Sequence, residues 1–123
     1  MKPISAADRR VTNIRTAAFE PWDAEGRSER GTSVLQLNPA ARRGVGFYIY
    51  KMEPGTRSVP HRHGGAEEFV IIEGTLIDND GTVYEKGDVV WLAPGTEHNS
   101  HTKTGCLIAV YAEAEAEAIS PTE

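Results

Sequence analysis

Residues 55–74 read GTRSVPHRHGGAEEFVIIEG and contain two of the four histidines of the chain. Side chains alternate between the two faces of an extended chain, so His61 and His63 point to the same face. Glu67 follows after a short glycine loop and precedes an apolar run. Two imidazoles and a carboxylate on one face make a compact nitrogen-and-oxygen site for a metal ion. The alternative is a solvated polar loop, because short metal motifs have many false matches.

A second stretch, residues 87–98, reads GDVVWLAPGTEH and places His98 after an apolar strand and a Pro-Gly turn. Strands far apart in sequence can face each other across the inside of a barrel. His98 can therefore complete the site from an opposite strand. His101 competes with it, but an odd separation puts the two on opposite faces unless the chain bulges after Asn99.

Both stretches resemble the two sequence motifs of the cupin superfamily. The first matches G-x5-H-x-H-x3-E-x6-G at every fixed position, namely Gly55, His61, His63, Glu67 and Gly74. The second resembles G-x5-P-x-G-x2-H-x3-N at Gly87, Gly95 and His98, with Ala93 in place of proline and Thr102 in place of asparagine. Neither departure removes a ligand, so they concern the geometry of the loop. Among cupins, residues 61–111 most resemble the cupin domain of ChrR-type anti-sigma factors and stand-alone relatives such as acetylacetone-cleaving dioxygenases.

The resemblance implies an all-β fold, a small antiparallel β-barrel of the jelly-roll or double-stranded β-helix type. It also implies one divalent metal ion per subunit, held by His61, His63, Glu67 and His98. The interval to Gly74 selects Glu67 over Glu68, which then points away. Three imidazoles and a carboxylate suit Fe, Zn, Mn, Ni or Cu. An octahedral ion would keep two positions open, whereas a tetrahedral zinc would be saturated by the four ligands.

Turn signals divide the chain into short strands without a convincing interior helix, which is typical of a sandwich or barrel. Strands are expected at 33–37, 45–52, 68–73, 75–78, 82–84, 89–92, around His98 and at 105–111. The barrel then spans residues 33–111, after an N-terminal segment 1–32 available for a dimer contact. Residues 112–123 are expected to be an acidic flexible tail, because Glu113 and Glu117 would repel each other on a helix.

Side chains on these strands can line a pocket or build the core. The pocket-lining candidates are Tyr48, Tyr50, Phe69, Ile71 and Trp91. Trp22, beside a proline, is interpreted as a structural plug at a barrel end, and Cys106 as a small buried hydrophobe. The expected core is Val45, Phe47, Ile49, Val70, Ile72, Val90, Leu107 and Val110.

Length and composition describe one ordinary globular domain of 123 residues with a formal charge of −5. Residues 1–62 hold 11 basic against 6 acidic side chains, and residues 63–123 hold 2 against 12. This acidic second half argues against nucleic acid as a partner. No apolar run reaches the roughly 20 residues of a membrane helix, so no membrane contact is expected. A single cysteine and no signal-peptide pattern indicate the cytoplasm.

The function expected from the resemblance is a metal-dependent dioxygenase or other oxidoreductase on a small metal-chelating oxygenated substrate, a β-diketone or hydroxyaryl ketone. The alternative is a non-catalytic, metal-loaded cupin that binds a small ligand or senses an oxidant. A sugar isomerase or epimerase ranks third, since no additional base residue is evident. A homodimer is expected, since dimerisation is common in the family.

Overall fold

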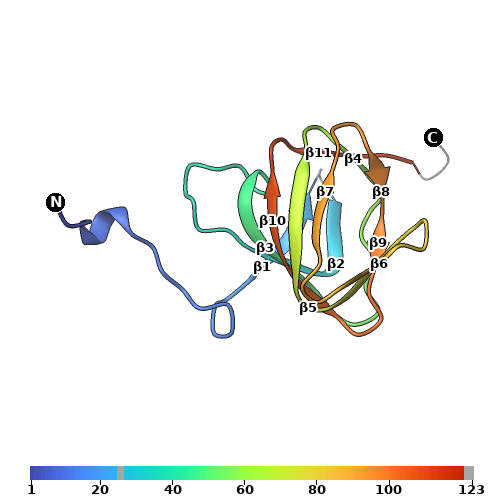
Figure 1. The fold of residues 1–123 in the computed structure, drawn as a ribbon, viewed down its shortest axis with the longest axis horizontal. Helices are drawn as coiled ribbons and strands as arrows, with labels where there is room; N and C mark the ends of the chain where they lie inside the picture. Colours follow the sequence, from blue (N-terminus) through green and yellow to red (C-terminus); the bar gives the residue numbers. More distant parts are fainter. Residues whose placement is uncertain (25–26, 121–123) are drawn as a thin grey trace.

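The computed structural model describes residues 1–24 and 27–120, which are almost entirely β structure (Figure 1). In these ranges the only helix is a 3-10 turn, η1, at Ala6–Asp8, and no helix is long and apolar enough to span a membrane. The strands are β1 Glu20–Ala24, β2 Arg27–Leu35, β3 Gly46–Met52, β4 His61–His63, β5 Glu67–Asp78, β6 Val83–Glu85, β7 Val89–Leu92, β8 Glu97–His98, β9 Ser100–His101, β10 Cys106–Ala112 and β11 Ala116–Ala118.

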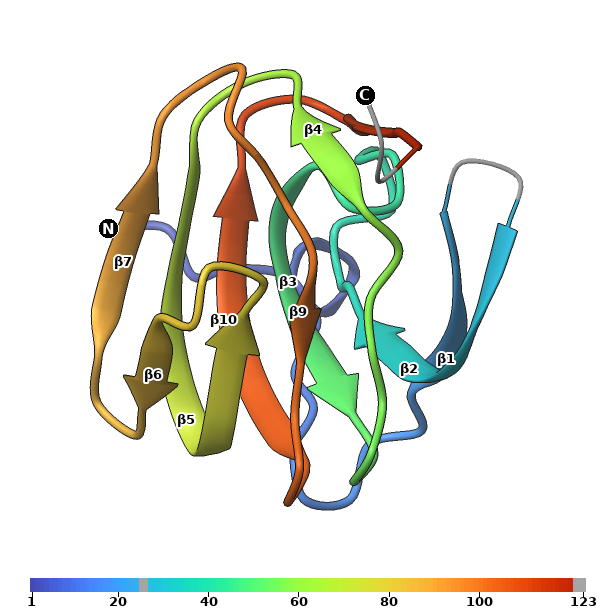
Figure 2. The same ribbon diagram turned by 90° about the vertical axis from the view of Figure 1, so that its right-hand side faces the viewer.

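Two antiparallel sheets form a curled half-barrel. The larger sheet runs β1-β2-β3-β10-β5-β6, and β7 and β9 also pair with β5. The smaller sheet has the order β11-β4-β8. Figure 2 shows β4 and β9 in front of β10 and β3, with the interior between them. The expected all-β cupin-type fold is therefore confirmed.

Strand β5 is the longest strand, with 12 residues, and it continues through Gly74 where the sequence predicted a turn. Gly74 has φ +78°, and a Cβ atom there would overlap the carbonyl oxygen of Gly105, which directly precedes the neighbouring strand β10. A glycine therefore lets the strand bend where a larger residue would collide. The first half of β5 pairs with β7, and the second half pairs with β6 and β9.

The expected acidic tail forms a strand instead. β11 pairs with β4 in the register Ala116↔His63 and Ala118↔His61, and Ile119 beyond it is buried. The reason is the alternation of alanine and glutamate: a period of two fits a strand, with partly buried alanines and exposed glutamates. Residues 121–123 of the expected tail lie outside the described residues.

The N-terminal boundary also differs from the expectation. The strand expected at 33–37 is the end of β2, which begins at Arg27 and forms a hairpin with β1. Both strands therefore reach into the segment 1–32. Only the residues before β1 extend away from the barrel as an arm (Figure 1).

The core lies on the concave face of the larger sheet. Its buried cluster comprises Val34, Tyr48, Met52, Phe69, Ile71, Leu76, Cys106, Ile108, Val110 and Ala112. Of the predicted core residues, Ile49 and Val110 are buried, but Phe47 is 61% exposed and the others are partly buried. On β3 and β5 the prediction chose the outer face, whereas Val90 on β7 and Val110 on β10 do contact the core. Both faces of these strands are apolar, so alternation alone could not tell the inside from the outside.

Candidate metal centre

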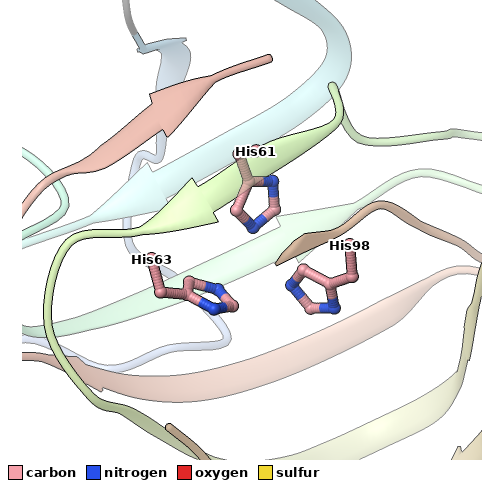
Figure 3. A group of neighbouring side chains, drawn as sticks. All are labelled: His61, His63 and His98. Atoms are coloured by element: carbon pink, nitrogen blue, oxygen red, sulfur yellow. The ribbon is translucent and has the colours of Figure 1, made fainter. Parts of the chain in front are cut away.

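Three imidazoles converge inside the half-barrel. His61 and His63 come from the same face of β4, and His98 lies on β8 directly opposite His61. The ring centroids are 4.6–5.0 Å apart, and one donor nitrogen from each ring lies within 4.8 Å of the others. Figure 3 shows the three rings facing a common point. Residues distant in sequence thus form one nitrogen cluster.

The Nδ1 atom of each ring has a fixed partner. His61 Nδ1 donates to the carbonyl oxygen of Val59 at 2.8 Å. His63 Nδ1 donates to Thr96 Oγ1 at 2.9 Å, since the hydroxyl proton of Thr96 is given to Ala93. His98 Nδ1 donates to Asp78 Oδ1 at 3.1 Å. In the neutral rings Nε2 then carries the lone pair, which is the atom and state that a metal ion requires.

His98 belongs to a buried polar network. The carboxylate of Asp78 accepts hydrogen bonds from His98, from Ser100 Oγ at 2.5 Å and from Tyr84 Oη at 2.6 Å. Burial alone would raise the pKa of Asp78, but these hydrogen bonds outweigh it and hold the pKa below its ordinary value. An ionised carboxylate behind His98 fixes the orientation of the ring and strengthens Nε2 as a donor.

Glu67 reaches one of the three imidazoles. Its Oε2 atom lies 3.1 Å from His63 Nε2, but the group with all donor atoms within 4.8 Å contains only the histidines. His63 Nε2 is buried and makes no hydrogen bond. A carboxylate oxygen and an imidazole lone pair this close repel each other unless a cation or a proton neutralises them. The residues present therefore fit a bound divalent metal ion.

Burial and neighbouring imidazoles keep His61 neutral. Desolvation is the largest effect and His98 the next, and together they lower the pKa of His61 from 6.5 to about 4. At neutral pH its Nε2 atom is therefore free of a proton. A metal ion can then bind without first displacing one.

The competing residues lie elsewhere. His101, on β9, is outside the imidazole cluster and pairs with Ile77 of β5. The strand is interrupted at Asn99, yet His98 and Ser100 still share the face that meets Asp78. Glu68 is exposed on the outer face of β5.

A cavity of about 320 Å³ adjoins the cluster. Tyr48, Tyr50 and Phe69 line it, as do His61, Glu67 and His98. Two lining predictions were wrong. Ile71 is packed in the core. Trp91 is 62% exposed on the outer face, because side chains alternate along β7 and Trp91, like Val89, points away from the interior.

Several residues of the site were not recognised in the sequence. Trp22, interpreted as a plug, lines the cavity and contacts the rings of Tyr48 and Tyr50 at 5.6 and 5.3 Å. Arg43, Ser100 and Glu115 also line it. Only Ser100 had a usable signal, two positions after His98 on the same face.

The two motif departures are accommodated. In the Pro-Gly turn the carbonyl oxygen of Ala93 accepts a hydrogen bond from the hydroxyl of Thr96, and the backbone N–H of Gly95 donates to the carbonyl oxygen of His63 at 2.8 Å. Thr102 is fully buried, and its hydroxyl donates to the carbonyl oxygen of Thr75 at 2.6 Å. The loop that carries His98 is thus closed without the usual proline and asparagine.

Comparisons with known proteins place this geometry in a family. The chain superposes on the polyketide cyclase RemF from Streptomyces resistomycificus at TM-score 0.71 and 16% identity, covering 94% of this chain and 88% of that one. It superposes on an acetylacetone dioxygenase from Acinetobacter johnsonii at TM-score 0.74 and 14% identity, covering 99% and 84%. For ChrR of Rhodobacter sphaeroides, in complex with SigE, the values are 0.64 and 14%, covering 81% and 51%.

Such low identities establish the fold alone. No curated protein sequence matches the chain significantly. A family profile, however, matches residues 9–115, most of the chain, and is described as the ChrR Cupin-like domain. By this match the chain belongs to the family of ChrR cupin-like domains.

Proposed function

We propose that this protein is a metal-dependent dioxygenase that acts on a small, metal-chelating oxygenated substrate of the β-diketone or hydroxyaryl ketone type. The observation that carries the proposal is the convergence of three imidazole rings, each with its Nδ1 atom in a hydrogen bond, beside a cavity of about 320 Å³ with aromatic walls. Pockets for small molecules begin at about 300 Å³, so a ligand of this class fits. The similarity to an acetylacetone dioxygenase supports the same chemistry.

His61, His63, His98 and Glu67 would hold the ion. A bound divalent metal would act as a Lewis acid towards the substrate oxygens and, if redox-active, would activate dioxygen. Asp78 holds the Nδ1 proton of His98 and keeps Nε2 aimed at the site. The three imidazoles would supply nitrogen donors, and Glu67, whose Oε2 atom lies 3.1 Å from His63 Nε2, would supply an oxygen donor.

The cavity wall would orient the substrate. Trp22 packs edge-on against Tyr50 and tilted against Tyr48, and Phe69 packs edge-on against Tyr84 with centroids 5.3 Å apart. Flat rings exclude water from the donor atoms and offer faces to a planar conjugated ligand. Exclusion of water strengthens the electrostatic interactions inside the site.

Membership in the ChrR cupin-like family favours a second function. The protein would then be a metal-loaded module that binds a small ligand or senses an oxidant without turnover. Cys106, buried and with its pKa raised by burial to about 11, is not a reactive thiol, so sensing would depend on the metal. The free cysteine fits a reducing compartment such as the cytoplasm.

One experiment separates the two functions. Protein purified without added metal is analysed for its metal content, and oxygen uptake is then measured with acetylacetone and 2-hydroxyacetophenone. Iron or another redox-active metal with substrate-dependent uptake supports the dioxygenase. Tightly held zinc, with no uptake for either compound even after reconstitution with Fe(II), contradicts it and favours the module.

A further inference from the structure

Two exposed, charged residues, Arg43 and Glu115, line the cavity beside the candidate metal centre. The other lining residues are buried or partly buried, so these two mark the place where the cavity meets solvent. We call Trp22, Arg43, Gly44 and Glu115 the cavity rim. Among the described residues that line the cavity, Arg43 carries the single fixed positive charge. A cation at this position can select the ligand.

The loop of residues 42–45, which contributes to the cavity rim, is held in one conformation. Gln36 Nε2 donates to two carbonyl oxygens of this loop at 3.1 and 2.7 Å, and Gln36 Oε1 accepts from the backbone N–H of Gly44 at 3.1 Å. Gly44 has φ +80°, and a Cβ atom there would lie 2.9 Å from an atom of the Trp22 ring. Only glycine allows this backbone and this close approach. The cavity rim is therefore preorganised, which lowers the cost of binding a ligand.

Arg43 has donors to spare for a ligand. Among the described residues its guanidinium donates to the carboxylate of Glu20 and, at 3.3 Å, to the carbonyl oxygen of Pro21. A guanidinium has five N–H groups, so these contacts leave several without a protein acceptor. The Glu20 side chain is 68% exposed, and exposed ion pairs are weak. Glu20 thus positions the arginine without using up its capacity to bind an anion.

The carboxylates that line the cavity are already engaged. Glu115 pairs with Arg42 at 3.1 Å, and Arg42 does not itself line the cavity. Glu67 lies next to His63 Nε2 at the candidate metal centre. The cavity of about 320 Å³ therefore offers a metal-binding cluster and a cationic rim within reach of one small molecule.

We propose that Arg43 binds a carboxylate of the ligand and that the cavity selects a metal-chelating oxygen compound with a carboxylate at its far end. The planar guanidinium matches a carboxylate through two parallel hydrogen bonds, which a neutral diketone cannot accept. The ligand class is thus a β-diketone acid, and Arg43 determines the specificity for it. The chelating end of the ligand rests on the proposed function, but the carboxylate end requires no turnover.

A matched pair of ligands tests the selection. 4,6-Dioxoheptanoate has a carboxylate where heptane-2,4-dione has a methyl group, and the two share the same β-diketone. Isothermal titration calorimetry of the Fe(II)-loaded protein under nitrogen measures binding without dioxygen for turnover. Wild type should bind the acid about 10–100-fold more tightly than the dione, the usual strength of hydrogen bonds to charged groups.

Substitution of Arg43 should remove this preference. Arg43→Gln should weaken binding of the acid by about 10–100-fold and leave the dione unchanged. Arg43→Lys should restore part of the loss, because it keeps the charge without the planar fork. Arg42→Gln is the control at the neighbouring arginine, whose side chain is 77% exposed. It should change either affinity by less than about fivefold.

Glu20→Gln separates ligand binding by Arg43 from a purely structural role. If Arg43 only anchored its loop through Glu20, Glu20→Gln and Arg43→Gln would weaken both ligands alike. If Arg43 binds the carboxylate, Glu20→Gln should keep the preference for the acid, because it removes a competing acceptor. Circular dichroism confirms that each variant is folded.

Equal affinities of wild type for acid and dione overturn the proposal, and so does an equal loss for both ligands in Arg43→Gln. No binding of the acid at about 1 mM overturns it as well. Oxygen uptake tests the proposed function separately. Uptake with acetylacetone but no preference for the acid would retain the dioxygenase and refute the role of Arg43. Selective binding of the acid without uptake would do the reverse.

Discussion

His98 and His101 are three residues apart, yet only His98 meets the other imidazoles. We expect His98→Ala to lower metal affinity by more than about 100-fold, above the usual effect of losing a supporting residue. His61→Ala and His63→Ala should do the same. His101→Ala should leave the affinity near wild type, since it lies outside the cluster. Competition against a chromogenic chelator measures all four variants, and equal losses for His98→Ala and His101→Ala would contradict the assignment.

Glu67 and Glu68 offer a matched pair of carboxylates on opposite faces of β5. Glu67→Gln removes the single anionic group next to His63 Nε2 and keeps the shape, so metal affinity should fall by about 10–100-fold. Glu68→Gln should have no effect on it. The same titration measures both. Anomalous diffraction with Glu68 at bonding distance from the metal would disprove the choice of Glu67.

The histidines could be found from spacing, but their supporting residues could not. His-x-His needs only strand alternation, which is a local rule. Asp78 lies 20 residues before His98 and reaches it because β5 and β9 pair at Asp78↔Ser100. That contact exists only in the folded chain, so no short motif encodes it. Trp22 was interpreted as a plug, not as part of the cavity wall, for the same reason.

Strand β11 carries no histidine of the site but pairs directly with β4. It covers the edge of β4, which carries His61 and His63, and Ile119 anchors it through a 3.0 Å hydrogen bond to Pro60 O. Ile119→Ala should lower the free energy of unfolding by about 2 kcal/mol through loss of buried contacts. It should also speed amide exchange in β4. Denaturant unfolding and hydrogen exchange provide the measurements.

Glu117→Ala is the control for this strand. The Glu117 side chain is 72% exposed and its ion pair with Arg62 spans 3.6 Å. Exposed pairs contribute little, so the change should stay below about 0.5 kcal/mol. Equal effects of Ile119→Ala and Glu117→Ala would show that β11 does not pack on β4 in solution.

The elements were predictable where turn residues mark both ends, as in β3, β7 and β10. They were not predictable where tertiary packing decides. The alternating alanine–glutamate segment was expected to be a flexible tail, although its period of two also fits a strand. The strand forms because β4 offers an edge with which it pairs. Gly74 reads as a turn, yet the sheet needs it as a bend within β5.

At the scale of the whole molecule, the core and the metal centre are separate sources of stability. The buried cluster includes Met52, Phe69, Ile71 and Ile108 and does not involve the imidazoles. We therefore expect chelated protein to remain folded at neutral pH, with a lower unfolding temperature than the metal-bound form. A bound ion adds stability according to its free concentration over its dissociation constant.

Acid should lower the stability of the folded protein over a defined pH range. The pKa of His61 is lowered from 6.5 to about 4, so as the pH falls the imidazole is protonated at a lower pH in the folded state than in the unfolded chain. The neutral His61 imidazole therefore contributes to the free energy of unfolding, by on the order of 3 kcal/mol at most. This contribution is complete above pH 6.5 and is lost as the pH falls towards 4. Metal-bound protein should lose its ion in the same window, because protons compete for the ligands.

Thermal unfolding with and without chelator, from pH 7 to pH 4, tests both statements. The two curves should be separated at pH 7 and should merge as the ion is released. His101→Ala should reproduce the wild-type separation, because His101 is outside the cluster. If chelator unfolds the protein completely at pH 7, the ion has a structural role and all its coordination positions are taken by protein ligands. The case for open coordination positions, and with it the proposed dioxygenase, would then be lost.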